Sequence, residues 1–241
     1  MKDIAVSSPA REKIITREIL ASIASGLLFP LGFIKSKKRM PKLKDQRTIV
    51  LIHGYGGNPS SLLPITQYLR ICGVQNIISF RYQAKYGIDR AARELKEFLR
   101  SHVRGGRIDF VCHSLGGLIA RVYLQDLGGA RRVDRCITLG TPHRGTYNAY
   151  WLSTRVGREL RPDSDFLARL ERSKEQAARV QFLSIVAGSD MIVIPRIFAQ
   201  GNENVMYVPD LGHLGLLFSP TVFRTVGRCL QGMEFSQKSP G

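Results

Sequence analysis

The chain of 241 residues has few cysteines, and this shortage excludes several kinds of site. Only four cysteines occur, and no two of them form a CxxC pair. The sequence therefore predicts no zinc site, no redox motif and no disulfide framework, and it favours a reducing compartment. The pattern Gly-x-x-x-x-Gly-Lys-Ser/Thr is also absent, which excludes the common phosphate-binding loop.

Acidic residues are scarce as well, because 19 Asp and Glu stand against 36 Lys and Arg, for a formal net charge of +17. Such an excess indicates an anionic partner: a nucleic acid, an anionic lipid or an acidic substrate. The chain has no recognised nucleic-acid motif and no basic stripe rich in aromatic residues, so we expect no nucleic acid. The densest basic segment spans residues 35–47, with seven Lys or Arg and a single Asp.

A stretch of 16 residues without charge, 19–34, precedes the basic segment. As a helix with a rise of ~1.5 Å per residue it would reach about 24 Å, short of the ~30 Å hydrocarbon core of a bilayer. A cleavable signal peptide would need a basic start, whereas this start is mixed in charge. We interpret residues 1–47 as an uncleaved membrane-associating segment with its basic residues on anionic headgroups. The alternative is a helix packed on its own domain in a cytoplasmic protein.

Beyond this segment, short apolar runs alternate with stretches of helical spacing. Residues 48–52 form a continuous β-branched run, typical of a strand buried on both faces of a parallel sheet. Further strands are predicted over 76–81, 108–112, 133–139, 180–187 and 205–208, and helices over 60–71, 88–102, 114–127 and 220–230. The alternation predicts one α/β domain over residues 48–241, with a mainly parallel central sheet flanked by helices. Residues 146–176 interrupt the alternation, and we interpret them as a small helical cap.

One apolar strand ends abruptly at Ser114, and the helix that follows begins with small residues. This pattern is typical of the nucleophile elbow, G-x-S-x-G, in which a strained turn exposes a serine. Gly116 and Gly117 supply the small neighbours, whereas Cys112 stands where the motif has its first glycine. The alternative is a buried strand that ends in a serine helix cap.

A serine hydroxyl becomes a good nucleophile only when an imidazole takes its proton and a carboxylate orients the imidazole. Asp190 and His213 follow Ser114, each after a predicted strand, in the order serine, acid, histidine. The carboxyl ends of parallel strands meet at one edge of a sheet, so we expect these three residues to form a catalytic triad.

Other residues compete for these roles. Asp210 lies three residues before His213, but it is better suited to shaping a turn. Asp163 and Asp165 lie in the predicted cap and are weaker rivals. His143 is the rival base, and we interpret it as a pocket-lining or structural residue.

The tetrahedral intermediate of acyl transfer needs two backbone N–H donors for its oxyanion. Leu115, the residue after the nucleophile, is expected to supply one of them. The loop at 53–57 follows the first long strand, and Tyr55 is its expected donor.

The segments HGYGG, HSLGG, TLGTPHRGT, GSD and GHLGLLFSP together resemble the α/β-hydrolase superfamily in its lipase branch. Residues 159–167 are similar to the cap of bacterial triacylglycerol lipases and of glycosylphosphatidylinositol deacylases. The resemblance spans residues 48–230 and implies an α/β-hydrolase fold and ester hydrolysis without a cofactor. It carries the catalytic roles onto Ser114, Asp190 and His213, and the oxyanion donors onto Tyr55 and Leu115.

The sequence thus predicts a serine carboxylic-ester hydrolase, a lipase or esterase, that acts on lipid or other acyl esters at a membrane. Trp151 and Leu152 in the cap are expected to contact the acyl chain. Because the core strands begin at Thr48, we expect a chain starting near Lys44 to keep its activity on short esters. Two alternatives use the same fold: an acyltransferase with the same triad, and a catalytically inactive, membrane-tethered binding protein.

Overall fold

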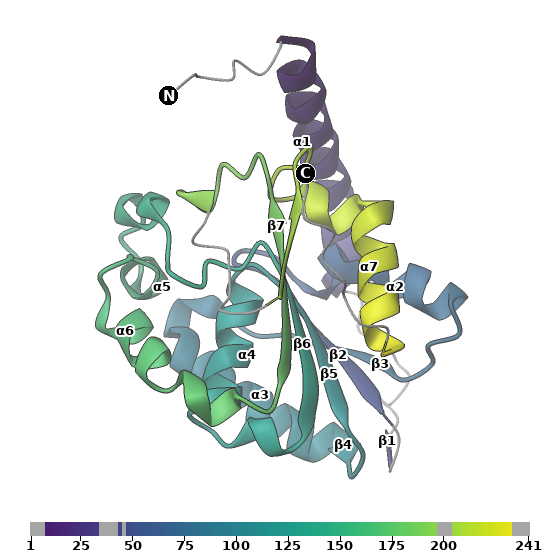
Figure 1. Cartoon of the computed structure of the whole chain (residues 1–241), viewed down its shortest axis with the longest axis vertical. Helices are drawn as coiled ribbons and strands as arrows, with labels where there is room; N and C mark the ends of the chain where they lie inside the picture. The colour runs from purple at the N-terminus through teal and green to yellow at the C-terminus, as the bar shows by residue number, and fades with distance from the viewer. Residues whose placement is uncertain (1–7, 34–42, 45–46, 197–203, 233–241) are drawn as a thin grey trace.

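A six-stranded sheet forms the centre of the computed structural model, which describes residues 8–33, 43–44, 47–196 and 204–232 (Figure 1). The strand order is β3-β2-β5-β6-β7-β8, and every neighbouring pair is parallel. The strands are β2 (Thr48–Ile52), β3 (Ile77–Phe80), β5 (Ile108–His113), β6 (Val133–Leu139), β7 (Gln181–Ala187) and β8 (Asn204–Val208). The predicted α/β fold with a parallel sheet is confirmed.

Helices cover both faces of this sheet. The α-helices are α1 (Ser8–Leu28), α2 (Leu63–Ile71), α3 (Ile88–His102), α4 (Leu115–Gln125), α5 (Arg155–Glu159), α6 (Asp165–Arg172) and α7 (Pro220–Leu230). Short 3-10 helices are η1 (Phe29–Phe33), η2 (Pro59–Leu62), η3 (Ala84–Tyr86), η4 (Gly129–Arg131), η5 (Tyr147–Trp151), η6 (Lys174–Ala177) and η8 (Gly215–Phe218). A separate parallel pair, β1 (Leu43–Lys44) with β4 (Val103–Arg104), was not expected, because two residues leave no periodic pattern.

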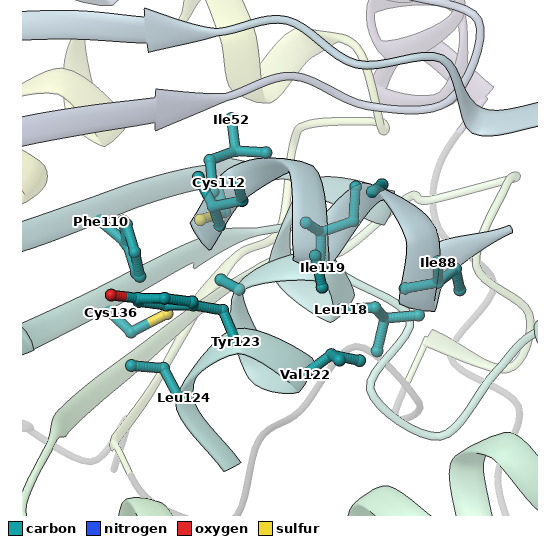
Figure 2. Close-up of a cluster of buried hydrophobic side chains, with 14 of the residues drawn as sticks. Ile52, Ile88, Phe110, Cys112, Leu118, Ile119, Val122, Tyr123, Leu124 and Cys136 are labelled. Carbon is teal, nitrogen blue, oxygen red and sulfur yellow. The ribbon is translucent and has the colours of Figure 1, made fainter. Parts of the chain in front are cut away.

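Successive residues of a strand point to opposite faces of the sheet, so β5 contributes to two apolar cores. Phe110 and Cys112 pack with α3, α4 and the cap helices on one face. Figure 2 shows them with residues of α4 and with Ile88 at the start of α3. Val111 packs with α2, η8 and α7 on the other face. Both faces are therefore covered, which explains why the strand runs are almost continuously apolar.

The segment predicted as a cap forms η5, α5, α6 and η6, and these helices pack on the domain. Its apolar residues Val156, Leu160, Phe166, Leu167 and Leu170 are buried in the core that contains α3 and α4. The Glu159 carboxylate accepts a hydrogen bond from the backbone N–H of Ile88 at 2.9 Å, at the start of α3. The cap is thus attached at the first turn of α3, where a carboxylate is favourable.

The amino-terminal helix α1 extends beyond the body of the domain (Figure 1). Residues Glu12–Gly32 are long and apolar enough to cross a membrane by length and composition alone, and little of this stretch is buried. One side of α1 contacts the domain, since Ala21 is buried and Arg17 Nη1 donates to the carbonyl of Asp210 at 3.3 Å. The other side carries exposed apolar side chains: Ile15, Ile19, Leu20, Ile23 and Leu27.

Most of the basic segment at 35–47 lies outside the described residues. Its last member, Arg47, binds two carboxylates of the domain, Asp109 at 2.9 Å and Asp134 at 2.7 Å. Arg47 therefore contributes to the fold as the ion-pair partner of two carboxylates.

Candidate active site

Ser114 occupies a strained turn between β5 and α4. Its backbone angles are φ 51° and ψ −122°, and it is the one non-glycine residue with positive φ in the described part of the chain. A non-glycine residue in such a region costs about 1–3 kcal/mol and persists only where its surroundings hold it. Its N–H donates to the Leu139 carbonyl at 2.9 Å, and its carbonyl accepts from the Thr141 hydroxyl at 2.8 Å. The turn is thus anchored to β6 and to the loop that follows it.

The two glycines after the serine are required by close packing. A Cβ atom at Gly116 would lie 2.5 Å from the backbone oxygen of Ile52, and one at Gly117 would lie 2.2 Å from Thr141 Oγ1. Cys112, at the motif's usual first glycine, is instead fully buried in the core (Figure 2). Burial, with Cys136 beside it, raises the pKa of the Cys112 thiol well above its ordinary value, so this cysteine is a small core residue and not a nucleophile.

Asp190 and His213 are brought together by the loops after β7 and β8. His213 Nδ1 lies 2.7 Å from Asp190 Oδ2, and Nδ1 donates because a carboxylate only accepts. The other oxygen, Asp190 Oδ1, accepts from the backbone N–H groups of Ile192 and Val193, each at 2.8 Å. The buried carboxylate is thus fixed on both oxygens, and Nε2 of His213 is left for a reacting group.

The rival acids have other positions. Asp210 is exposed, and its carbonyl accepts from Arg17 of α1. Asp163 accepts a hydrogen bond from the Tyr150 hydroxyl at 2.7 Å. The geometry therefore favours Asp190 over both as the partner of His213.

Ser114 and His213 lie at the same edge of the sheet. His113, the neighbour of Ser114, packs on His213 with ring centroids 4.8 Å apart, and its Nε2 lies 3.4 Å from the His213 carbonyl oxygen. No hydrogen bond joins the Ser114 hydroxyl to His213 among the described residues, and the hydroxyl does not cap α4. Such contacts are often long before substrate binds, so the geometry is compatible with a serine–histidine pair.

A second serine–histidine contact occurs inside the domain. His143 Nε2 lies 3.0 Å from Thr138 Oγ1 and 3.5 Å from Ser184 Oγ. Ser184 is buried in the middle of β7, so a substrate carbonyl has no access to its oxygen. Burial lowers the pKa of His143 well below its ordinary value, and the charges of Arg121 and Arg144 add to this. The arrangement agrees with a structural role for His143.

Tyr82 contacts the loop at 53–57 and fixes its first residue, a role that the sequence did not predict. The Tyr82 hydroxyl donates to the His53 carbonyl at 2.8 Å, and the two rings stack with centroids 4.4 Å apart. Burial lowers the pKa of His53 to about 4, so its ring is neutral at pH 7. The only sequence signal was an aromatic residue just after β3.

The expected oxyanion donors Tyr55 and Leu115 lie on facing segments. Leu115 is the first residue of α4, where N–H groups have no partner within the helix. Neither its N–H nor that of Tyr55 donates to another backbone carbonyl in the described residues. A cleft of about 360 Å³ adjoins this loop and is lined by residues 53–57 and 82–85.

Of the two cap residues expected to contact the acyl chain, Trp151 is exposed and Leu152 is half-buried. Trp151 is 87% exposed, and Leu152 packs against Gly157, where an added Cβ would lie 2.3 Å from the Leu152 carbonyl oxygen. Their contact with substrate stays a prediction. No group of three or more His, Cys, Asp or Glu side chains able to hold a metal occurs within the ranges that the structure describes.

Comparison with known proteins agrees with this architecture. The family model described as palmitoyl protein thioesterase matches residues 48–182. The product of gene lin2722 from Listeria innocua is 18% identical, with a TM-score of 0.58 over 80% of this chain and 96% of that one. The propeptide form of the Bacillus licheniformis lipase BlEst2 is 14% identical, with a TM-score of 0.66 over 84% of this chain and 54% of that one. Lipase B of Aspergillus fumigatus is 14% identical, with a TM-score of 0.62 over 78% and 52%. The chain thus spans about half of each of these two lipases, and all three likenesses establish the fold.

Proposed function

The chain belongs to the palmitoyl protein thioesterase family and is a serine hydrolase of the ester-cleaving kind, and from this premise we propose that Ser114, His213 and Asp190 cleave acyl esters at a membrane surface. The observation that carries the proposal is the strained Ser114 turn beside the 2.7 Å contact between His213 and Asp190. A strained serine and an oriented imidazole are the two parts that acyl transfer needs.

The first half of the reaction forms an acyl-enzyme. Ser114 Oγ attacks the substrate carbonyl carbon while His213 Nε2 takes the hydroxyl proton. The N–H groups of Tyr55 and Leu115 donate to the oxyanion of the tetrahedral intermediate. His213 then gives its proton to the leaving alcohol or thiol, and the bond between carbonyl carbon and leaving group breaks.

The second half repeats these steps with water. His213 takes a proton from water, the hydroxide attacks the acyl carbon, and the proton returns to Ser114 Oγ as the carboxylic acid leaves. Asp190 orients the imidazole and stabilises the imidazolium that forms twice per turnover. An acyltransferase would differ only in the acceptor, so product analysis with an added alcohol separates the two.

A long acyl chain is the substrate part that fits this protein best. The family description names a palmitoyl thioester, and the exposed apolar side of α1 offers a route by which the protein meets such chains in a bilayer. Thioesters and oxygen esters share the same tetrahedral intermediate, so both are chemically accessible to the site. We place long-chain thioesters first among its substrates.

An interfacial position of α1 agrees better with its contacts than a full crossing of the bilayer. Arg17 and Glu18 lie in the middle of the helix, where Arg17 contacts the domain. A bilayer crossed by α1 would enclose these charges together with a domain loop, which is unfavourable in hydrocarbon. Insertion of the exposed apolar side alone avoids this difficulty.

The decisive experiment is labelling of the full chain with a fluorophosphonate probe, together with hydrolysis of p-nitrophenyl esters of graded length and of a palmitoyl thioester. Ser114→Ala should abolish labelling and lower kcat by roughly 10⁴-fold or more. Ser184→Ala is the matched control and should keep both. An unlabelled wild-type chain would favour the inactive binding protein instead, and loss of labelling in the control alone would mean that the nucleophile is wrongly assigned.

A further inference from the structure

The middle of α1 contacts the loop that carries His213. The Glu18 carboxylate accepts the backbone N–H of Leu214 at 3.1 Å and that of Gly215 at 2.6 Å, across 196 and 197 residues of sequence. These are the first two residues after His213. Hydrogen bonds to a charged acceptor are shorter and stronger than neutral ones, so this contact can fix a loop.

The loop is shaped to receive this carboxylate. A Cβ atom at Gly212 would lie 2.2 Å from Glu18 Cδ, and one at Gly215 would lie 2.8 Å from Glu18 Oε1. The loop therefore has room for the Glu18 side chain because Gly212 and Gly215 are glycines. Arg17, the preceding residue of α1, donates to the Asp210 carbonyl in the same loop at 3.3 Å.

The same amino-terminal segment also contacts the loop beside the expected oxyanion donor. The Phe29 carbonyl in η1 accepts from Asn58 Nδ2 at 2.9 Å. Asn58 Oδ1 in turn accepts from the Ser60 N–H at 2.9 Å and from its hydroxyl at 2.6 Å. A Cβ at Gly32 would lie 2.0 Å from Asn58 Oδ1, so the fit is close here too.

We propose that Glu18 is a positioning residue for His213: it fixes the backbone just after the catalytic base and makes α1 a working part of the active site. The inference rests on the proposed role of His213. Asp190 fixes the ring at Nδ1, whereas the backbone that carries the ring leaves β8 as an irregular loop. Without Glu18, the loop would have no bond to α1 at Leu214 and Gly215. The expectation that a chain starting near Lys44 stays active is therefore replaced by its opposite.

The test compares full-length Glu18→Ala and Glu18→Gln with Glu12→Ala, a matched control at an exposed position six residues earlier on α1. A displacement of about 1 Å can cost 10²-fold in rate, so we expect Glu18→Ala to lower kcat for p-nitrophenyl acetate by roughly 10- to 100-fold with KM unchanged. Glu18→Gln keeps one acceptor oxygen and should recover part of kcat. Glu12→Ala should stay within about twofold of wild type, as is usual for surface changes.

Hydrogen–deuterium exchange of residues 211–218 provides a readout that does not depend on catalysis. The amides of Leu214 and Gly215 should exchange faster in Glu18→Ala and not in Glu12→Ala. Unchanged exchange, or unchanged kcat in a folded Glu18 variant, would overturn the proposal; if Glu18→Ala fails to fold, Glu18→Gln decides. The wild-type chain could also cleave no ester while Glu18 still slows exchange at Leu214 and Gly215. That result would support the loop contact and contradict only the proposed function.

Discussion

Asp190 holds His213 with one carboxylate oxygen, at 2.7 Å, while its other oxygen is held by two backbone N–H groups. Asp190→Asn would present an amide that can donate to Nδ1 and so favours the wrong tautomer of the imidazole. We expect kcat to fall about 10⁴-fold with little loss of stability. Asp210→Asn is the control, measured with the same ester. A large loss in that control and none in Asp190→Asn would transfer the role of the acid to Asp210.

The backbone oxygen of Ile52 leaves no space for a side chain at Gly116. Gly116→Ala forces β2 and α4 apart, and overpacking of this kind costs about 1–3 kcal/mol. We expect a lower Tm and slower fluorophosphonate labelling of Ser114, since the turn rests on this packing. Gly26→Ala lies in α1 with no atom near its added Cβ and should leave both unchanged or raise Tm slightly. Normal labelling of a Gly116→Ala protein would show that the turn tolerates a wider spacing.

Much of this site could be read from the sequence because it depends on local patterns. Ser114, Asp190 and His213 each follow an apolar run, and parallel strands bring such ends to one edge of the sheet. The direction of an apolar helix face, in contrast, depends on what packs against it. Residues 146–176 were predicted as a cap, yet two apolar residues of this segment, Phe166 and Leu170, pack into the core with α4.

The contact of Glu18 with Leu214 and Gly215 could not be predicted for a related reason. The residues are almost 200 positions apart, and no period or motif connects them. The uncharged stretch that begins just after Glu18 predicted a membrane-associating segment, whereas Glu18 itself contacts the domain. Tertiary packing determines which residues pair in this way. In the sequence, the small residues Gly212 and Gly215 are the sign that another group lies close to this loop.

Stability should fall in mild acid because of buried histidines. Burial lowers the pKa of His53 from its ordinary 6.5 to about 4 in the folded chain. Between these values the unfolded chain binds more protons than the folded chain. The contribution of neutral His53 to the free energy of unfolding is therefore fully present above pH 6.5 and decreases as the pH falls toward 4. The shift of this one histidine changes the free energy of unfolding by about 3 kcal/mol at most.

Urea unfolding midpoints measured between pH 7 and 4 test this expectation. His53→Gln should have a lower midpoint at pH 7, since it disturbs the stack on Tyr82, but a shallower loss toward pH 4. His102→Gln at the end of α3 is the control. Parallel curves for wild type and His53→Gln would mean that other groups, such as His113, dominate the acid response.

Trp151 tests whether the cap meets the acyl chain. The side chain is 87% exposed, so Trp151→Ala should not alter Tm. If the indole covers a long chain, kcat/KM for a palmitoyl ester should fall about tenfold or more, while acetate ester hydrolysis stays constant. Equal effects on both esters would leave the residue outside the acyl site.

The exposed apolar side of α1 should bind membranes. Ile19 and Ile23 are both more than half exposed, and neither takes part in the hydrogen bonds of Glu18, so changing them to Asn removes exposed apolar area and keeps the Glu18 contact. Each buried apolar side chain contributes about 1.5–3 kcal/mol, and each basic residue near an anionic surface about 1 kcal/mol before screening. Wild type should therefore sediment with anionic vesicles, and high salt should weaken this binding without abolishing it. The double variant should remain largely in the supernatant while it keeps its activity on acetate esters.

Ile71→Asn, at an 85% exposed apolar position on α2, is the matched control and should bind as wild type does. Equal sedimentation of all three proteins would place the membrane contact elsewhere on the chain, and a wild-type protein that stays in the supernatant at low salt would mean that α1 serves the domain alone.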